Sequence, residues 1–371
     1  MDAIKTPKTA SDHPFASFAR STAVPTGLIF VLSMCLHRTY CSVKKGLAVF
    51  PMDVVLISAF LGILLVILWS RFQVLKAVSD HPPQGIFVRV SGGKIHLRDI
   101  GPRDAPPERT LVMLHGASSN LLALTVPLAP YLEKNFRILA IDRPGHGYSD
   151  RPDGRADASP VKQAKLISEA MVAAGVTEAI IVAHSLSGAL ATTLAMDYPE
   201  RVLGLVLLAP ATHPWPGGLT WYYYPASWPV VGWLFSRVLP VAGAHFSMKA
   251  SLASVFHPQV PPSDYIQSTA LNLVLRPANF MANAQDVAAL FAHVTERCGH
   301  YGKITVPTVV ISGEDDQTVY TSIHTVSLGR ELPDVKIHIL KGVGHMPHHA
   351  VPERVVYEIE QLSKRVNATR S

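Results

Sequence analysis

The sequence of 371 residues predicts an α/β protein with a mostly parallel, doubly wound sheet, helices on both of its faces and a helical cap insertion. Three observations predict this class. Short apolar runs rich in β-branched residues alternate with helical segments from residue 86 onward. One long segment, residues 213–302, interrupts this alternation and has no strand pattern. A content of 48% hydrophobic and 16% charged residues excludes a disordered chain.

The N-terminal part of the chain differs in character from the rest. Residues 1–46 are expected to be disordered or weakly structured, and the uncharged apolar run Val54–Trp69 follows them. Extended to residues 47–71, this segment is long enough to cross a bilayer core of about 30 Å, and Arg71 gives it a basic edge. We therefore expect a single-pass membrane anchor in contact with lipid, on an undetermined side of the membrane. A cleaved signal peptide and a buried core helix are the alternatives.

Charge and motifs exclude several other classes of function. The net charge is +6, and residues 1–80 hold eight Lys or Arg against four Asp, so much of the excess flanks the predicted anchor. The rest of the chain has no basic run of the kind that binds nucleic acid. Cys35, Cys41 and Cys298 form no Cys-x-x-Cys pair, and phosphate-binding, dinucleotide-binding and His-Glu-x-x-His motifs are absent from the sequence. We therefore expect no nucleic-acid partner, no cofactor and no metal.

The predicted fold begins with a β-hairpin. Ile86–Val90 and Lys94–Asp99 flank the turn residues Ser91-Gly92-Gly93. Further strands are expected wherever a short apolar run is bounded by turn residues, which occurs at Thr110–Leu114, Phe136–Ile141, Ala179–Ala183, Val202–Leu208, Thr308–Ile311 and Val335–Leu340. Helices are expected between or after these strands, at Val161–Ala174, Gly188–Tyr198, Tyr320–Glu331 and Pro352–Val366. The alternation of strand and helix predicts parallel pairing after the hairpin.

The interruption divides the folded part into a core, residues 86–212 and 303–366, and a helical cap, residues 213–302. An insertion at this point of an α/β sheet covers the carboxyl ends of the strands, where such folds bind ligands. The cap opens with a dense aromatic segment, Trp215–Phe235. Its rings are consistent with an acyl-binding wall, with a membrane-interface contact, or with simple packing of the cap on the core.

A candidate nucleophile lies at the end of one buried strand. Residues 180–188 form an apolar strand that runs into a turn of small residues and then into a helix. This context is typical of a nucleophile elbow, a sharp turn that raises a serine hydroxyl above the sheet and requires small neighbours. Here the serine is Ser185, and Ala183 and Ser187 stand in place of the usual glycines. The alternative is a serine that only caps the helix.

Four landmarks together resemble the α/β-hydrolase superfamily, in the serine hydrolase branch with a helical cap, over about residues 86–366. They are the pair His115-Gly116 after a strand, the loop Asp142–Ser149 after the next strand, the loop that holds Gly313–Asp316, and the loop that holds Gly344-His345. Their order along the chain is the order found in the family. The resemblance implies the α/β-hydrolase fold.

The resemblance also implies a catalytic triad. Ser185 is expected to attack, His345 to accept its proton, and Asp316 to orient His345. The spacing Gly-x-x-Asp favours Asp316 over its neighbour Asp315. The pair Gly344-His345 favours His345 over the two other histidines of that loop, His348 and His349.

Two backbone N–H groups are expected to form the oxyanion hole. Elbow geometry assigns one to Leu186, and the resemblance assigns the other to Ala117. In one respect the chain departs from a related branch: the Gly-Pro-Gly that would strengthen a likeness to carbon–carbon bond hydrolases does not follow His115-Gly116.

These features together predict a serine hydrolase. The expected reaction is cleavage of a carboxylic ester or related acyl bond of a small apolar substrate through an acyl-enzyme. Carbon–carbon, amide or perhydrolase chemistry on the same triad is an alternative. A catalytically silent, membrane-tethered binding module is another. The sequence identifies neither the substrate nor the oligomeric state, and leaves Met1 and Met52 open as translation starts.

Overall fold

A computed structural model of the chain describes residues 51–217 and 223–370, together with Ser33, Met34, His37, Tyr40, Cys41 and Lys44. The prediction for residues 1–46 therefore lies almost wholly outside the described residues. The chain divides into two compact units, Met1–Trp69 and Ser70–Ser371. Each unit is described by itself.

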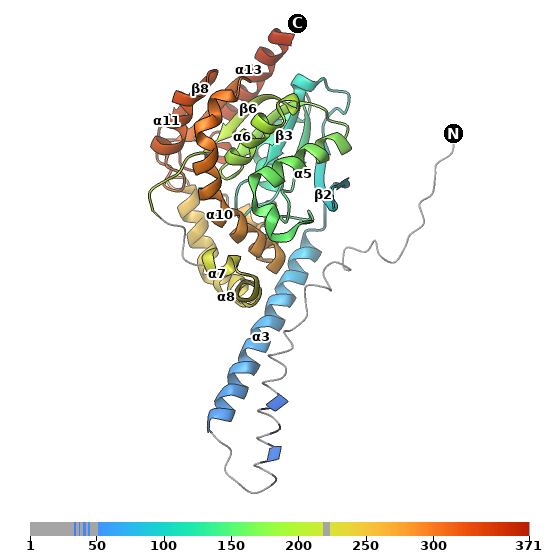
Figure 1. Ribbon diagram of the computed structural model, residues 1–371, viewed down its shortest axis with the longest axis vertical. Helices are drawn as coiled ribbons and strands as arrows, with labels where there is room; N and C mark the ends of the chain where they lie inside the picture. Colours follow the sequence, from blue (N-terminus) through green and yellow to red (C-terminus); the bar gives the residue numbers. More distant parts are fainter. Residues whose placement is uncertain are drawn as a thin grey trace, which may run out of the picture. The chain divides into compact units, whose positions relative to one another are not determined.

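The apolar N-terminal segment is helical, as predicted. Helix α3 spans Pro51–Asp80 (Figure 1) and contains an 18-residue window of mean hydropathy 2.4, of which 11% is buried. By length and composition this helix can cross a membrane. It ends at Asp80, nine residues beyond the predicted end at residue 71. Residues 72–80 contain neither proline nor glycine, a Lys76–Asp80 ion pair of 2.7 Å forms among them, and the first proline follows only at position 82.

One eight-stranded sheet forms the centre of the second unit, in the order β1-β2-β4-β3-β5-β6-β7-β8. The strand β2 pairs antiparallel with both β1 and β4, and all other neighbours pair parallel. All eight predicted strands are present. Their bounds are β1 Ile86–Val90, β2 Gly93–Ile100, β3 Thr110–Leu114, β4 Arg137–Ile141, β5 Ala179–His184, β6 Val202–Leu208, β7 Thr308–Gly313 and β8 Val335–Leu340.

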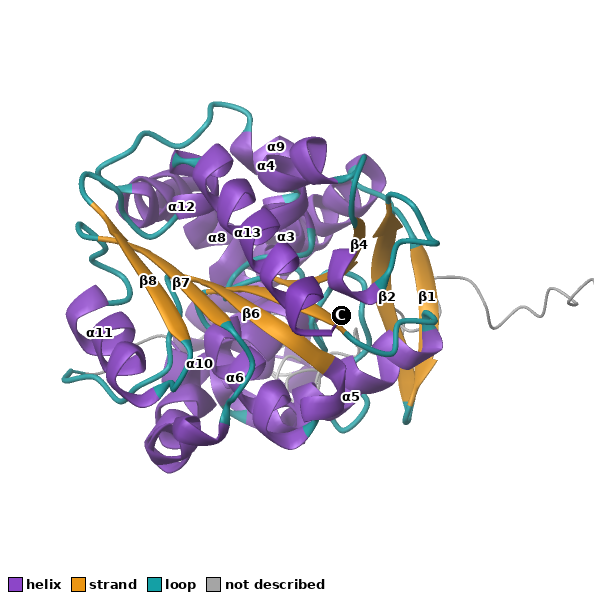
Figure 2. Ribbon diagram, turned by 90° about the horizontal axis from the view of Figure 1, so that it is seen from above, coloured by secondary structure: helices purple, strands orange, loops and turns teal. Residues whose placement is uncertain are grey.

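Helices cover both faces of the sheet (Figure 2). One face carries α5 (Pro160–Ala173), α6 (Ser187–Asp197) and α11 (Thr321–Glu331), and the other carries α4 (Leu122–Leu132) and α13 (Pro352–Arg370). The central strand β5 shows the alternation that builds the two cores. Its Ile181 and Ala183 pack with α5 and α6, whereas Ile180 and Val182 pack with α4 and α13. All four side chains are fully buried, as expected for a parallel sheet covered on both sides.

The sequence prediction omits α4. This helix holds Pro127 and Pro130 within its 11 residues, and prolines normally mark the end of a helix. Its buried Leu124 and Leu128 stabilise it through the core under the sheet. Tertiary packing therefore decides its conformation where the local sequence does not.

The segment predicted as a cap is helical in its described part. Between β6 and β7 the chain forms α7 (Tyr223–Ser227), α8 (Pro229–Phe256), α9 (Tyr265–Ser268) and α10 (Pro277–Arg297), and residues 213–217 and 223–302 contain no strand. The helices α8 and α10 each begin with a proline, which suits the first helical position because no N–H is needed there. Trp221 and Tyr222 of the aromatic segment lie outside the described residues.

Candidate active site

The turn between β5 and α6 has the geometry of a nucleophile elbow. Ser185 has a φ of +55°, a left-handed conformation that is strained for a residue with a side chain. Two backbone hydrogen bonds hold it there: its N–H donates to the carbonyl of Leu208 at 2.9 Å, and its own carbonyl accepts from the N–H of Gly188 at 2.8 Å. The strain at Ser185 and the direct passage from strand to helix favour the elbow over a simple helix cap.

Three predicted site residues meet at the carboxyl end of the sheet. His345 Nε2 lies 3.0 Å from Ser185 Oγ, and His345 Nδ1 lies 2.7 Å from Asp316 Oδ2. Ser185 follows β5, Asp316 follows β7 and His345 follows β8. Because these strands are parallel, their ends lie at one edge of the sheet. The arrangement is one in which a histidine can accept the hydroxyl proton while a carboxylate orients its ring.

The carboxylate of Asp316 is stabilised in its ionised form. Burial alone would raise its pKa, but the charge and hydrogen bond of His345 outweigh burial and lower the pKa below its ordinary value. The N–H groups of Thr318 and Val319 also donate to Asp316 Oδ1, at 2.8 and 2.9 Å. With Asp316 ionised, Nδ1 of His345 donates to it and Nε2 is left to accept from Ser185.

The competing residues of the same loops lie elsewhere. Asp315 is exposed, whereas Asp316 is buried. The ring of His348 packs against His184 with ring centres 4.5 Å apart, and the ring of His349 packs against Phe256 at 5.4 Å. Burial lowers the pKa of both histidines, that of His349 to about 4. The geometry therefore brings His345, and neither His348 nor His349, to the serine and the carboxylate.

The loop after β3 passes directly beside Ser185. A Cβ atom added to Gly116 would lie 3.1 Å from Ser185 Cβ and 2.9 Å from the ring of His184, so only glycine fits without displacement. The next residue, Ala117, packs against the apolar cluster that contains Leu186. Both residues expected to donate to an oxyanion therefore belong to segments adjoining the serine.

An apolar cluster lies between the elbow and cap helix α10. Its buried members are Leu186, Ala189, Ala211, Leu290 and Val294, and Ala117, Trp215, Val287 and Val319 pack against them. This cluster gives the surroundings of the serine an apolar character on the cap side.

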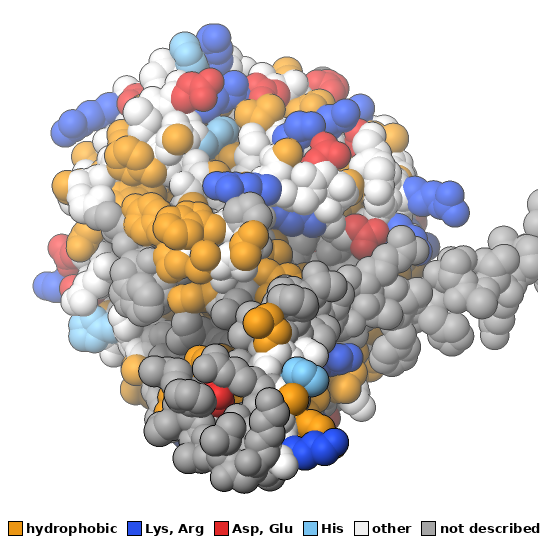
Figure 3. All heavy atoms as spheres, turned by 60° about the horizontal axis from the view of Figure 1, so that its bottom comes forward, with side chains coloured by type: hydrophobic (Ala, Val, Ile, Leu, Met, Phe, Trp, Pro, Cys, Tyr) orange, Lys and Arg blue, Asp and Glu red, His pale blue; other side chains and the backbone are white. Residues whose placement is uncertain are grey.

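The aromatic segment of the cap divides into packed and exposed rings. Trp215 contacts Phe291 of α10 edge-on, with ring centres 5.2 Å apart, and it also packs against the apolar cluster that contains Leu186 of the core. Tyr224 and Trp228, by contrast, are 49% and 52% exposed. Figure 3 shows apolar side chains gathered on one face of the molecule.

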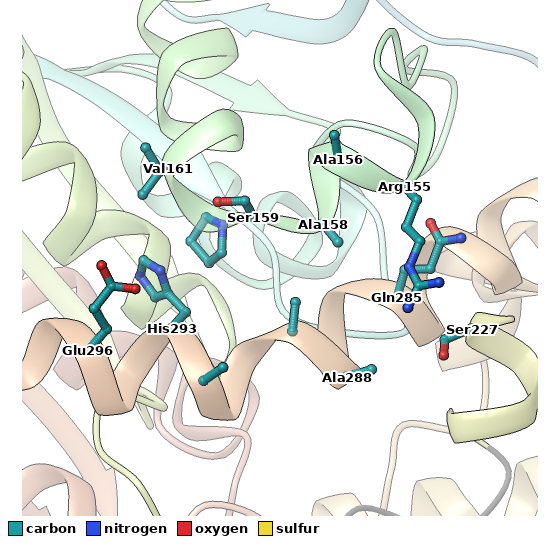
Figure 4. A pocket seen from close by; sticks show the side chains of 13 residues that line it. Arg155, Ala156, Ala158, Ser159, Val161, Ser227, Gln285, Ala288, His293 and Glu296 are labelled. Atoms are coloured by element: carbon teal, nitrogen blue, oxygen red, sulfur yellow. The ribbon is translucent and has the colours of Figure 1, made fainter.

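A cavity of about 400 Å³ lies on another side of α10 (Figure 4). Ala288, His293 and Glu296 of α10 line it together with Arg155 and Val161. None of the predicted catalytic residues lines this cavity. Within residues 51–217 and 223–370 no group of three or more His, Cys, Asp or Glu side chains is arranged to hold a metal ion.

The sequence prediction missed a buried ion pair beside the site. Arg143, in the loop after β4, and Asp286, in cap helix α10, are joined at 2.7 Å and are both buried. The two residues are 143 positions apart, so no local pattern pairs them. The available signal was a charged residue in each of two segments expected to pack together.

Comparison with known proteins defines the family. The sequence profile of the family described as "alpha/beta hydrolase fold" matches residues 109–350. This chain belongs to the α/β-hydrolase fold family. Membership makes it a hydrolase in its broad class, in accord with the fold and the elbow.

Two relatives and one solved structure illustrate the range of the family. The chain is 27% identical over 266 residues to a 2-hydroxy-6-oxononadienedioate/2-hydroxy-6-oxononatrienedioate hydrolase of Comamonas testosteroni. It is also 27% identical over 267 residues to a 2-hydroxy-6-oxo-6-phenylhexa-2,4-dienoate hydrolase of Burkholderia cepacia. Each match covers 69% of this chain and 86% of the relative. A carboxylesterase from Bacillus subtilis has a similar structure, with a TM-score of 0.59 at 20% identity over 80% of this chain and 98% of that chain.

Proposed function

We propose that this α/β hydrolase cleaves a carboxylic ester or related acyl bond of an apolar substrate through a covalent acyl-enzyme. One observation carries the proposal: the hydrogen-bonded series from Ser185 through His345 to Asp316, with contacts of 3.0 and 2.7 Å. A serine hydroxyl becomes nucleophilic when a base within hydrogen-bond reach accepts its proton. The same two contacts argue against a catalytically silent binding module.

In the proposed reaction, Ser185 Oγ attacks the acyl carbon while His345 Nε2 takes its proton. Asp316 stabilises the imidazolium that forms. The N–H groups of Ala117 and Leu186 bind the oxygen anion of the tetrahedral intermediate. His345 then returns the proton to the leaving group, and a water molecule activated by the same histidine hydrolyses the acyl-enzyme.

The apolar cluster beside the elbow supports an apolar acyl group. Leu186, Leu290 and Val294 are buried there, and Trp215 and Val287 pack against them. An acyl chain next to these side chains would lose contact with water, which stabilises binding by about 25 cal/mol for each Å² buried.

A fluorophosphonate probe tests the proposed nucleophile. We expect wild-type protein to be labelled and Ser185→Ala to remain unlabelled. Ser312→Ala is the matched control, since Ser312 is also buried but its hydroxyl bonds to Thr325 at 2.7 Å. Labelling that persists in Ser185→Ala, or none in folded wild-type protein, contradicts the proposal.

Carbon–carbon bond hydrolysis is the second candidate, and the names of the two relatives favour it. The two activities are separated by comparing p-nitrophenyl esters of increasing chain length with 2-hydroxy-6-oxo-6-phenylhexa-2,4-dienoate. We expect larger kcat/KM values for the esters. A larger value for the dienoate would replace the ester proposal with the carbon–carbon one.

We also propose that α3 anchors the enzyme in a membrane. The support is the length of the helix, its mean hydropathy of 2.4 and the small buried share of its apolar window. An apolar substrate and a membrane anchor fit together, since apolar esters concentrate in lipid.

A further inference from the structure

The proposed oxyanion hole depends on the orientation of one peptide unit, the one that joins Gly116 to Ala117. A peptide unit is planar and trans, so the N–H of Ala117 points opposite to the C=O of Gly116. Whatever holds that carbonyl oxygen therefore also aims the N–H. Because this reasoning uses Ala117 as a donor, it rests on the proposed function.

Two donors hold the Gly116 carbonyl from the side away from the N–H. His115 Nδ1 lies 2.9 Å from this oxygen, and Arg143 Nη2 lies 3.2 Å from it. The backbone N–H of Arg143 donates to His115 Nε2 at 3.0 Å, so Nδ1 carries the proton of the neutral ring. Burial lowers the pKa of His115 well below its ordinary value, which keeps the ring neutral.

The preceding carbonyl is held in the same way. Arg143 Nε donates to the carbonyl of His115 at 3.1 Å, and Ser187 Oγ donates to it at 2.5 Å. A single guanidinium thus bridges two successive carbonyl oxygens of the loop beside Ser185. The planar fork of arginine suits this task, whereas a lysine ammonium is a compact point charge without a fixed fork of donors.

The cap supplies the charge that keeps this guanidinium in place. Arg143 is fully buried, and its Nη1 donates to Asp286 Oδ2 of helix α10 at 2.7 Å and to Gln163 at 3.0 Å. The other oxygen of Asp286 accepts from Arg151 at 2.9 Å. A buried guanidinium without such partners would be strongly destabilising. Helix α10 is therefore part of the support of the loop.

The helix α10 holds the same loop at a second point. Asn283 Oδ1 accepts from the backbone N–H of Ser118 at 2.6 Å, and Asn283 Nδ2 donates to Ser118 Oγ at 3.0 Å. Ser118 has a φ of +50°, which is strained for serine and requires such support. Residues 116–118 are thus fixed on both sides of Ala117 by contacts that lead to α10.

We infer that Arg143 is a positioning residue for the oxyanion hole, and that Asp286 and Asn283 couple the orientation of the Ala117 N–H to cap helix α10. Arg143 itself does not contact the reacting atoms. It acts through the 116–117 peptide, so its contribution appears in the transition state, where the oxyanion forms.

The test compares Arg143→Lys with the wild type on a p-nitrophenyl ester. Lysine keeps the positive charge beside Asp286 but lacks the planar fork with which Arg143 bridges both carbonyls. Loss of one oxyanion donor lowers kcat by about 10²- to 10³-fold, so we expect a decrease of at least about tenfold with KM changed less than about twofold. Affinity for a phenylboronic acid, whose tetrahedral adduct at Ser185 places a negative oxygen in the hole, should fall in parallel.

The control is Arg137→Lys. Arg137 forms a similar two-bond ion pair with Asp99, at 3.0 and 3.0 Å, and bonds a backbone carbonyl at 2.8 Å, but these contacts lie at the other end of the strands from Ser185. The Arg137→Lys variant should be less stable than the wild type and should keep the wild-type kcat. If Arg143→Lys does not fold, Asn283→Ala is tested instead, because this variant leaves the ion pairs of Asp286 intact. For Asn283→Ala we expect kcat to fall about three- to tenfold at constant KM.

The outcomes separate this inference from the proposed function. The positioning role is overturned if the folded variants keep the wild-type kcat, or if an increase in KM accounts for their whole loss of kcat/KM. In both cases the wild type remains active, so the proposed function stands. A wild-type protein that neither hydrolyses esters nor binds the boronic acid overturns the proposed function and this role together.

Discussion

The two adjacent carboxylates after β7 show how much a single residue position matters in this site. Asp316 is buried against His345, and Asp315 points to solvent. We expect Asp316→Asn to lower kcat for ester hydrolysis by about 10³- to 10⁴-fold, because the amide cannot stabilise the imidazolium. Asp315→Asn should stay within about twofold of the wild type. Steady-state kinetics of the two variants checks this, and comparable losses in both would contradict the assignment of Asp316.

At the same scale, the sequence predicts the residues that have a local signature and misses those that do not. Ser185 lies in a strand-turn-helix pattern, and His345 follows a glycine after a predicted strand, so both can be located without a structure. Arg143 and Asp286 lack such a pattern because they meet only when the cap packs on the core. Contacts between distant segments depend on tertiary packing, which periodicity does not encode.

At the scale of elements, the helix α3 was predicted from its apolar run, but its end was not. Residues 72–80 mix apolar and polar side chains and contain neither proline nor glycine, so composition alone could not place the end at Asp80. The sequence prediction omits the helix α4 because its two prolines indicate a break in a helix. In the structure, packing in the core stabilises the helix despite them.

The proposed anchor gives a prediction for α3. We expect the protein to remain in the membrane pellet after extraction with alkaline carbonate, because a spanning helix is held by the apolar core of the bilayer. Intact-mass measurement of the extracted protein is the control. Release into the supernatant would contradict an integral helix, and a mass that lacks the whole segment up to Trp69 would identify a cleaved signal peptide instead.

At the scale of the whole molecule, buried histidines link stability to pH. Burial, with a further contribution from Arg297, lowers the pKa of His293 to about 4 from 6.5. Between pH 6.5 and pH 4 the unfolded chain binds a proton at His293 that the folded state does not. The contribution of neutral, buried His293 to the free energy of unfolding is therefore fully present above pH 6.5 and is lost as the pH falls towards 4. At pH 5 the loss amounts to about 2 kcal/mol of the free energy of unfolding.

Urea unfolding of the wild type and of His293→Gln at several pH values measures this contribution of His293. His293→Gln should flatten the decrease in free energy of unfolding between pH 7.5 and pH 5 by about 2 kcal/mol. The exposed His300, replaced by glutamine in the same way, is the control and should leave the profile as in the wild type. An unchanged profile in His293→Gln would contradict the buried, neutral state of this ring.

The overall architecture was predictable because its signals repeat along the chain. The first two strands flank a glycine-containing turn and the other six are short runs rich in apolar residues, and the order of the landmarks from His115 to His345 matches the topology that brings them together. The substrate was not predictable from these signals. It depends on the shape of the apolar surface between Leu186 and Val294, which several distant segments of the chain build jointly.

In the proposed reaction, Ser185 carries the acyl group as an ester of its Oγ. Rapid acid quench of the protein with a p-nitrophenyl ester, followed by peptide mapping by mass spectrometry, measures this directly. We predict an added acyl mass on the peptide that contains Ser185, in close to equal proportion to enzyme at early times. Ester turnover with no acylated peptide, or with the acyl group on another residue, would contradict the account.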